Sequence, residues 1–372
     1  MIVPTFASDR MYCLQSRAGV VRWLAGCICG ACLFVSAVAQ SGVEDNSAKE
    51  NTERGQALIR EGRLAEAEVF LQKAVQASPE DVSLLTLLGK IKGRMREYPD
   101  AIAIFQRVIQ LSQKSADAHV DLAIAYSDAG AFPKALDETS KALAIDPHSA
   151  AAHLNRGRIL DDLKRGQDAD AEFAQACQLA PGNPDGYFYW SFVERGQGNF
   201  AKEAALLQRV VKLQPDNAKA FVLLGGSLLE QSRKTEAVAA LRKALAINPD
   251  SSEATYMLSR ALLSSSPEQS KRLRQHFEEL RQKQAALDRS KSLGNEAYGA
   301  FTKQDWATAI RAFKEALEVC GDCEIQAALH KNLGLTLCKS GDLREGGNEL
   351  RESLALNPND PDVVKALAVI GQ

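Results

Sequence analysis

Small and apolar side chains recur along this chain at a fixed interval of 34 residues. When repeats are numbered from residues 48, 82, 116, 150, 184, 218 and 252, position 8 holds only small residues: Gly55, Gly89, Ala123, Gly157, Ser191, Gly225 and Ser259. A sustained period of this length is typical of stacked helical hairpins. The pattern therefore predicts an all-α array in which each repeat contributes two helices.

Three further positions predict how these helices pack. Position 20 holds Ala67, Ala101, Ala135, Ala169 and Ala237; position 24 holds Leu71, Phe105, Phe173 and Leu241; position 27 holds Ala74, Val108, Ala142, Ala176, Val210 and Ala244. We expect positions 8 and 20 to meet where the two helices cross, because a bulky residue there would overpack at a cost of about 1–3 kcal/mol. Glu203 at position 20 and Thr139 at position 24 depart from the pattern.

The ends of the helices are marked as well. Position 32 holds Pro79, Pro147, Pro181, Pro215 and Pro249, and proline ends a helix because it lacks an amide hydrogen. Two residues later each repeat has a side chain suited to cap the next helix: Asp81, Ser115, Ser149, Asn183, Asn217 and Ser251.

These positions resemble those of the tetratricopeptide repeat (TPR) family. The resemblance implies a right-handed α-α superhelix, here of about 8–9 hairpins with a C-terminal capping helix. It also implies that the first helices line a concave face that binds other proteins or peptides.

The repeats divide the chain into regions. Residues 51–266 fit six full repeats and the first helix of a seventh, and residues 290–372 fit two further repeats and the capping helix. Between them, residues 267–289 form a charged stretch with a narrow apolar stripe, Leu273, Phe277, Leu280 and Leu287. We expect a long helix that links the two regions.

The N-terminal segment has a different character. Arg10, Arg17 and Arg22 precede an uncharged run from Trp23 to Ala39, which ends in Ala37-Val38-Ala39. This order is typical of a secretory signal peptide over 1–39, although an uncleaved membrane anchor fits the same residues. We expect an exported protein, periplasmic or secreted, or one tethered to the membrane by this segment. The polar residues 40–50 are predicted to be a flexible lead-in.

Charge and motifs exclude several classes of function. The chain has 45 Lys and Arg against 47 Asp and Glu, so it lacks the basic excess of a nucleic-acid-binding protein. It contains no phosphate-binding glycine loop, serine nucleophile elbow or zinc-protease motif. We expect no enzymatic activity, no cofactor and no metal site, and we expect contact with the membrane only through the N-terminal segment if it is uncleaved.

Cysteines are the one chemical motif that the repeats leave unexplained. Cys320 and Cys323 enclose Gly321-Asp322 between the predicted eighth hairpin and the helix that follows. We expect a local disulfide, which an oxidising compartment would permit. Free thiols, pairing with Cys338, or a redox or metal-binding role for this loop remain alternatives.

Candidate binding residues come from the first helices. Positions 5, 9 and 12 of repeats three to seven supply the candidates Val120, Ile124, Leu154, Arg158, Phe188, Phe192, Arg195, Val222, Tyr256 and Arg260. An apolar strip with a charged rim is typical of a partner site. The alternative is that these side chains pack against neighbouring helices.

The sequence thus favours a non-enzymatic scaffold in the cell envelope that binds a peptide or helix of a partner protein. A thiol-redox or metal-binding protein that uses the Cys320–Cys323 loop is one alternative. An accessory factor in pilus or outer-membrane assembly is another, and it rests on family analogy alone.

Overall fold

A computed structural model describes residues 36–371, with side chains from residue 48 on, and within this range every regular element is an α-helix. The expected signal peptide or anchor lies for the most part outside the described residues. Among the described helices, none combines the length and the apolar character needed to cross a bilayer.

The described helices form two compact units, which divide between Ala261 and Leu262. The first unit, here called the repeat array, contains α1 (Ser36–Arg60), α2 (Leu64–Ala77), α3 (Val82–Arg94), α4 (Tyr98–Leu111), α5 (Ala116–Asp128), α6 (Phe132–Ile145), α7 (Ala150–Asp162), α8 (Gly166–Leu179), α9 (Pro184–Gly196), α10 (Phe200–Leu213), α11 (Ala218–Glu230), α12 (Lys234–Ile247) and α13 (Ser252–Ala261). The second, here called the C-terminal unit, contains α14 (Pro267–Thr302), α15 (Trp306–Cys320), α16 (Gln326–Ser340), α17 (Leu343–Leu356) and α18 (Pro361–Ile370).

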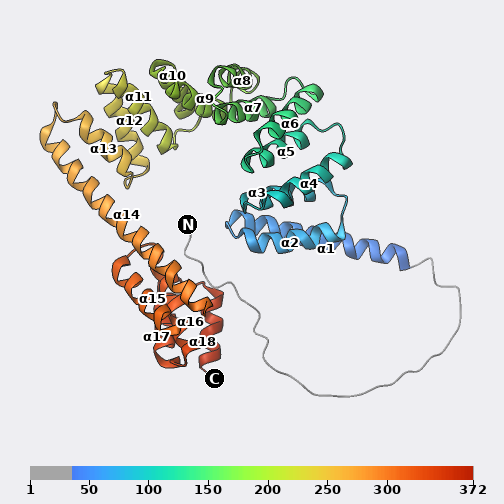
Figure 1. Cartoon of the computed structure of the whole chain (residues 1–372), viewed down its shortest axis with the longest axis vertical. Coiled ribbons are helices and arrows are strands. Elements are labelled where there is room, and N and C mark those ends of the chain that lie inside the picture. Colours follow the sequence, from blue (N-terminus) through green and yellow to red (C-terminus); the bar gives the residue numbers. More distant parts are fainter. Residues whose placement is uncertain (1–35, 372) are drawn as a thin grey trace. The chain divides into compact units, whose positions relative to one another are not determined.

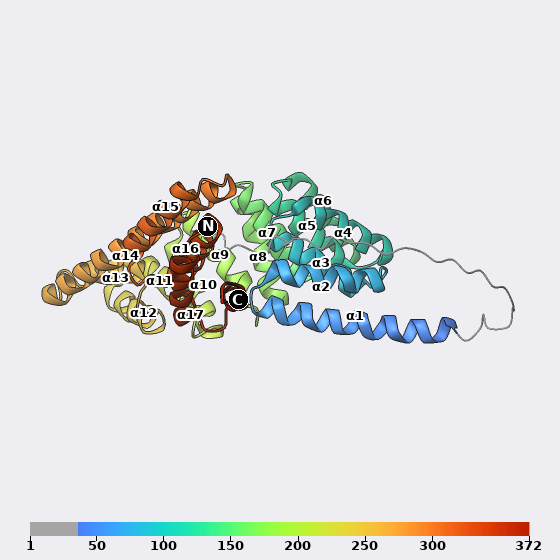
Figure 2. The same cartoon turned by 90° about the horizontal axis from the view of Figure 1, so that it is seen from below.

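In the repeat array, α1 to α12 pair in sequence order as six hairpins, and α13 is the first helix of a seventh repeat (Figures 1 and 2). Consecutive first helices touch directly, as in α3–α5, α5–α7, α7–α9 and α11–α13. Contacts between consecutive second helices are sparser. The array therefore curves with its first helices on the inner side, and positions 5, 9 and 12 of these helices form what we call the inner face.

In the C-terminal unit, α14 pairs with α15 and α16 pairs with α17, while α18 packs against α17. The eight hairpins of the two units and the final helix confirm the predicted all-α repeat fold. The charged stretch 267–289 belongs to one continuous helix of 36 residues, α14, visible as the long orange helix in Figure 1. Residues 40–50 differ from the flexible lead-in that we expected, because α1 begins at Ser36 and runs through them.

Side-chain caps begin the first helices, as the sequence predicted. The side chains of Asp81, Ser115, Ser149, Asn183, Asn217 and Ser251 each accept a hydrogen bond from a backbone amide of the helix that follows. Each cap satisfies an amide that the helix itself leaves without a partner.

The turn inside each hairpin requires a backbone conformation that only half of the repeats mark with glycine. Position 15 adopts a positive φ in all eight hairpins, at Gly62, Arg96, Gly130, Lys164, Gly198, Ser232, Gln304 and Gly341. Glycine adopts this conformation without strain, whereas other residues incur a cost of about 1–2 kcal/mol. Four hairpins therefore hold a strained residue at this turn.

Position 8 is small because the side chain at position 24 of the same repeat fills its space. A Cβ built on Gly89 would lie 2.8 Å from the ring of Phe105, and one built on Gly225 would lie 2.6 Å from Cγ of Leu241. The expected approach of positions 8 and 20 also occurs, since a Cβ on Gly334 would lie 2.9 Å from the carbonyl oxygen of Gly346. The contact between positions 8 and 24 is the more regular of the two.

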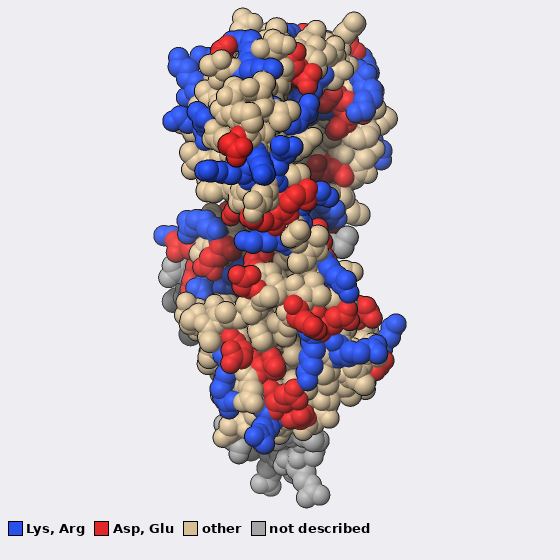
Figure 3. Space-filling view, turned by 90° about the vertical axis from the view of Figure 1, so that its left-hand side faces the viewer, with Lys and Arg blue, Asp and Glu red and all other residues tan. Residues whose placement is uncertain are grey.

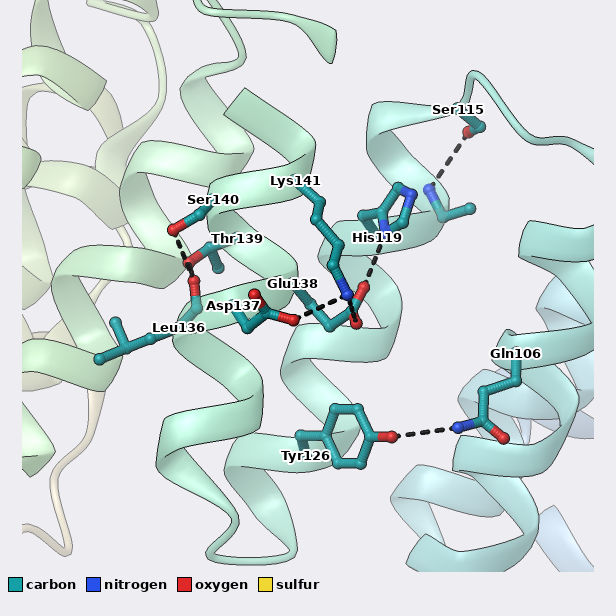
Figure 4. Close-up of polar contacts among 11 residues, drawn as sticks. Gln106, Ser115, His119, Tyr126, Leu136, Asp137, Glu138, Thr139, Ser140 and Lys141 are labelled. Atoms are coloured by element: carbon teal, nitrogen blue, oxygen red, sulfur yellow. Dashed lines mark hydrogen bonds and ion pairs between the residues drawn. The ribbon is translucent and has the colours of Figure 1, made fainter. Parts of the chain in front are cut away.

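Positions 4 and 23 form a second repeated contact within the hairpins. His119 faces Glu138 in Figure 4, where Nδ1 lies 2.6 Å from Oε2 and Lys141 binds the other carboxylate oxygen at 2.8 Å. The pairs His153–Glu172 and His330–Glu349 occupy the same two positions at 2.8 and 2.6 Å. These three histidines therefore pack within the hairpins, as expected, each paired with a carboxylate.

The structure joins Cys320 and Cys323 in a disulfide, with a Cα–Cα distance of 5.2 Å. It links the last residue of α15 to the short turn before α16. Cys338 is not its partner, since Cys177 and Cys338 are the free cysteines of the described residues.

We predict that Gly225→Ala lowers the free energy of unfolding by about 1–3 kcal/mol, because the new methyl group would overlap Leu241. Gly93→Ala is the control, since a Cβ there meets no atom within 4 Å. It should raise stability by up to about 1 kcal/mol through helix propensity. Urea unfolding followed by circular dichroism measures both, and equal effects of the two substitutions would contradict the packing argument.

We predict that Cys320→Ala together with Cys323→Ala costs about 2 kcal/mol, the loop-closure contribution of so short a cross-link. Peptide mapping without reductant should recover the two cysteines in one linked peptide. Recovery of both cysteines alkylated, with an unchanged unfolding midpoint for the double variant, would show that the cross-link does not form.

Candidate protein-binding surface

The ten candidate residues of the inner face do not form a continuous exposed strip. Val120 and Val222 are buried, at 5% and 4% exposure. Val120 packs with Ala142 of its own repeat and Ala152 of the next, and Val222 packs in the corresponding way with Ala244 and Ala254. The prediction that these two valines bind a partner is therefore wrong, because a short side chain at position 5 is buried in the contact between neighbouring hairpins.

Ile124 and Leu154 are half-buried and belong largely to the packing between repeats. Ile124 packs against the cluster that contains Val120. Leu154 packs against the cluster around Phe173. The apolar strip expected from the third repeat onward is thus interrupted over α5 and α7.

The longer side chains on α9 and α13 do reach the inner face. Phe188 and Phe192 on α9 are half-buried, with their rings edge to face at a centroid distance of 5.0 Å. Tyr256 on α13 is 43% exposed. Aromatic rings in this intermediate exposure combine a large apolar area with access from solvent, which suits a binding surface.

Cations lie over these and neighbouring rings. Lys219 lies 5.8 Å from the ring centroid of Phe188, Arg260 lies 5.8 Å from that of Tyr256, and Arg158 lies 4.8 Å from that of Tyr189. Such contacts hold the cationic side chains near the helix surface. The candidates Arg158 and Arg260 thus border the aromatic rings.

Arg195 is held differently, by a buried carboxylate. Its Nε donates to Oε1 of Glu203 at 2.7 Å, and Glu203 is only 1% exposed. Burial raises the pKa of Glu203, and the nearby Arg195 offsets part of that rise. Glu203 stands at position 20, where most repeats of the array hold alanine. This departure from the repeat pattern is the feature of the sequence that could have indicated the Arg195–Glu203 pair.

The other aromatic residues of α9 do not contribute to the inner face in the same way. Trp190 donates from Nε1 to Asp170 on α8, and Lys202 lies 4.4 Å from its ring centroid. Tyr187 lies under Arg209 of α10 at 5.5 Å. The aromatic run on α9 is therefore divided between the inner face and the contacts with its neighbours.

Charge over the surface is mixed. On the face shown in Figure 3, Lys and Arg lie interspersed with Asp and Glu. Burial raises the pKa of Asp128 on α5 and of Asp161 on α7. The array thus presents acidic groups near the ends of α5 and α7, and it presents aromatic and cationic groups on α9 and α13.

The described thiols give no support to redox chemistry. Burial raises the pKa of Cys177 to about 11. Burial and the charge of Asp342 also raise the pKa of Cys338. Reactive cysteines have lowered pKa values, so neither thiol is activated. No group of three or more His, Cys, Asp or Glu in the described residues could hold a metal ion.

Comparison with protein families gives three matching models. A model described as the cytochrome c-type biogenesis protein H TPR domain matches residues 204–324. Two tetratricopeptide repeat models match residues 86–150 and 140–184, and residues 51–81.

Curated relatives match parts of the chain. Anaphase-promoting complex subunit 3 of Schizosaccharomyces pombe is 28% identical over 34% of this chain and 19% of that protein. The peroxisomal targeting signal receptor of Komagataella phaffii is 25% identical over 50% of this chain and 34% of the receptor. The chain therefore spans about a fifth to a third of the length of these two relatives.

Solved structures also match. A tetratricopeptide repeat protein from Parabacteroides merdae is 17% identical over 78% of this chain and 99% of its own, with a TM-score of 0.44. A thermophilic TPR protein from Thermus thermophilus is 19% identical over 49% and 99% of the two chains, with a TM-score of 0.45. The family models, together with paired helices at a period of 34 residues, show that this chain is built from tetratricopeptide repeats.

Proposed function

We propose that this protein is a non-enzymatic interaction scaffold, which binds a peptide or a helix of another protein on the inner face of its repeat array. The observation that carries the proposal is the group of partly exposed residues Phe188, Phe192 and Tyr256, with Arg195 and Arg260 beside them. We call these five residues the inner patch.

The physical argument rests on how binding energy is distributed in protein interfaces. A few aromatic and arginine side chains in the centre of an interface supply most of the binding free energy. The inner patch offers these residue types on rigid helices, so little conformational entropy is lost when a partner binds. A curved row of first helices fits an extended segment or a single helix. One curated relative is named as a targeting signal receptor, which agrees with recognition of a peptide.

We further propose that the protein acts outside the cytoplasm, in the cell envelope. The basic and then apolar segment 1–39 supports this location, with either a cleaved signal or a retained anchor. The Cys320–Cys323 disulfide also supports it, because such bonds persist mainly in oxidising compartments.

A more specific candidate is a role in cytochrome c maturation. The match of residues 204–324 to a cytochrome c-type biogenesis TPR domain favours it over pilus or outer-membrane assembly, which rests on analogy alone. A thiol-redox function of the Cys320–Cys323 loop stays an alternative, because a joined Cys-x-x-Cys pair is also the oxidised form of a redox dithiol.

We predict that Phe192→Ala weakens partner binding by about 2 kcal/mol or more, while the protein stays folded. The matched control is Val222→Ala on the neighbouring first helix. This substitution should lower stability by about 2 kcal/mol through a core cavity and leave the affinity of the folded protein unchanged.

Envelope proteins captured by the parent protein identify the partner, and calorimetry with that partner measures both affinities. Thermal melting measures both stabilities. If Val222→Ala weakens binding as much as Phe192→Ala does, or if neither affects it, the partner binds elsewhere.

A further inference from the structure

The side chain of Arg195 extends from α9 to the neighbouring first helix, α11. Nη2 lies 2.6 Å from Oε1 of Glu203 and 3.4 Å from the carbonyl oxygen of Leu223 in α11. The side chain nevertheless keeps 35% of its surface exposed. The buried carboxylate and the Leu223 carbonyl thus fix the orientation of the guanidinium, while about a third of the side-chain surface remains exposed.

Gly226 is what allows this arrangement. It occupies position 9 of the sixth repeat, where the other repeats of the array carry Gln56, Lys90, Ile124, Arg158, Phe192 and Arg260. A Cβ built on Gly226 would lie 3.6 Å from Nη2 of Arg195 and 3.5 Å from Cε of Met257 on α13. Gly226 is itself buried, so the guanidinium of Arg195 and the end of Met257 occupy the space that the longer side chains of the other repeats would fill.

The charges around Gly226 favour an acidic ligand group. Position 9 of the four first helices from α7 to α13 reads Arg158, Phe192, Gly226 and Arg260, a row without a carboxylate. Arg260 lies one turn after Met257 on α13, where it is exposed and lies over the ring of Tyr256. Glu230 lies one turn after Gly226, and its negative charge helps to raise the pKa of Glu203. The same charge would repel an acidic ligand group.

We propose that Arg195 forms a specificity subsite for a carboxylate side chain of the bound segment, an Asp or Glu that contacts the exposed part of the Arg195 side chain next to a large apolar residue held by Phe188 and Phe192. Glu203 positions the guanidinium, and its charge also weakens the attraction for a second carboxylate. The subsite deepens the proposed scaffold function and rests on it. Arginine suits this role because its guanidinium carries five N–H donors, so one carboxylate can orient it while a second contacts it.

The buried carboxylate of Glu203 determines which variants can test the role of Arg195. Arg195→Gln alone would leave a buried carboxylate without its cation, and such changes often unfold a protein. Glu203→Ala removes that problem, because alanine is the residue at position 20 in most repeats of the array. The matched variants are therefore Glu203→Ala, which frees Arg195, and Glu203→Ala with Arg195→Gln, which removes it. Arg209→Gln, a cation on the second helix α10, is the control.

The probe is a library of random linear peptides displayed on phage and selected on the full chain. Enriched peptides are then synthesised with their acidic residue and with the matching amide, and their affinities are measured by fluorescence anisotropy. We expect enrichment of an acidic residue beside a large apolar one. The amide should bind the parent protein about ten-fold more weakly, because a hydrogen bond to a charged group is lost.

The variants should differ in their preference for acid. Glu203→Ala keeps Arg195 and should bind the acidic peptide more tightly than its amide, whereas the double variant should bind acid and amide equally. Arg209→Gln should behave as the parent. A preference for acid that survives in the double variant, or that is absent in Glu203→Ala, would overturn the subsite.

The same experiment separates this inference from the proposed function. Peptides enriched without any acidic preference, whose binding is lost in Phe192→Ala, would refute the subsite and leave the scaffold function standing. If the library yields no peptide that binds the parent protein, the subsite for a linear segment is refuted, and capture of envelope proteins by the parent protein then decides the scaffold function.

Discussion

The structure depends on one contact, which each hairpin repeats: the side chain at position 24 of the second helix fills the space that a small residue leaves at position 8 of the first. Gly89 receives the ring of Phe105, and Gly225 receives Leu241. Because interiors are close-packed, this contact fixes how closely the two helices approach. Where position 24 is the smaller Thr139, position 8 is Ala123 instead of glycine, so the two volumes complement each other. Hairpins of nearly constant shape then stack in register, and the first helices lie on the inner side of the curve.

The stacking of the hairpins determines which side chains of the first helices are buried and which remain exposed on the inner face. A valine at position 5 is short enough to be covered by the next hairpin, whereas phenylalanine or tyrosine at the same position extends beyond that contact. This difference in length agrees with a buried Val222, a Phe188 that packs partly against the core and stays half-buried, and an exposed Tyr256. The fifth repeat departs furthest from the pattern, with a buried Glu203 in place of alanine and the paired Arg195 above it. Buried ion pairs often add little stability, so the pair is better explained by the orientation it gives to the arginine.

Much of the fold could be predicted from the sequence, because period, small residues, capping residues and prolines are local signals that repeat in phase. The capping residues from Asp81 to Ser251 and the histidines at position 4 lie where the repeat places them. The burial of Val120 could not be predicted, since it depends on the tightness of the curve. The left-handed turn at Arg96, Lys164, Ser232 and Gln304 was missed because only half of the hairpins mark it with glycine. The helix through residues 40–50 was missed because their polar composition resembles that of a flexible segment.

The central claim is that the partner is held by the inner face and not by the second helices. Site-specific photocrosslinking tests it most directly, with p-benzoylphenylalanine placed in turn at Phe192 on α9 and at the exposed Gln208 on α10 of the same hairpin. The account predicts a cross-linked partner from position 192 and none from position 208. Cross-links from position 208 alone would contradict it.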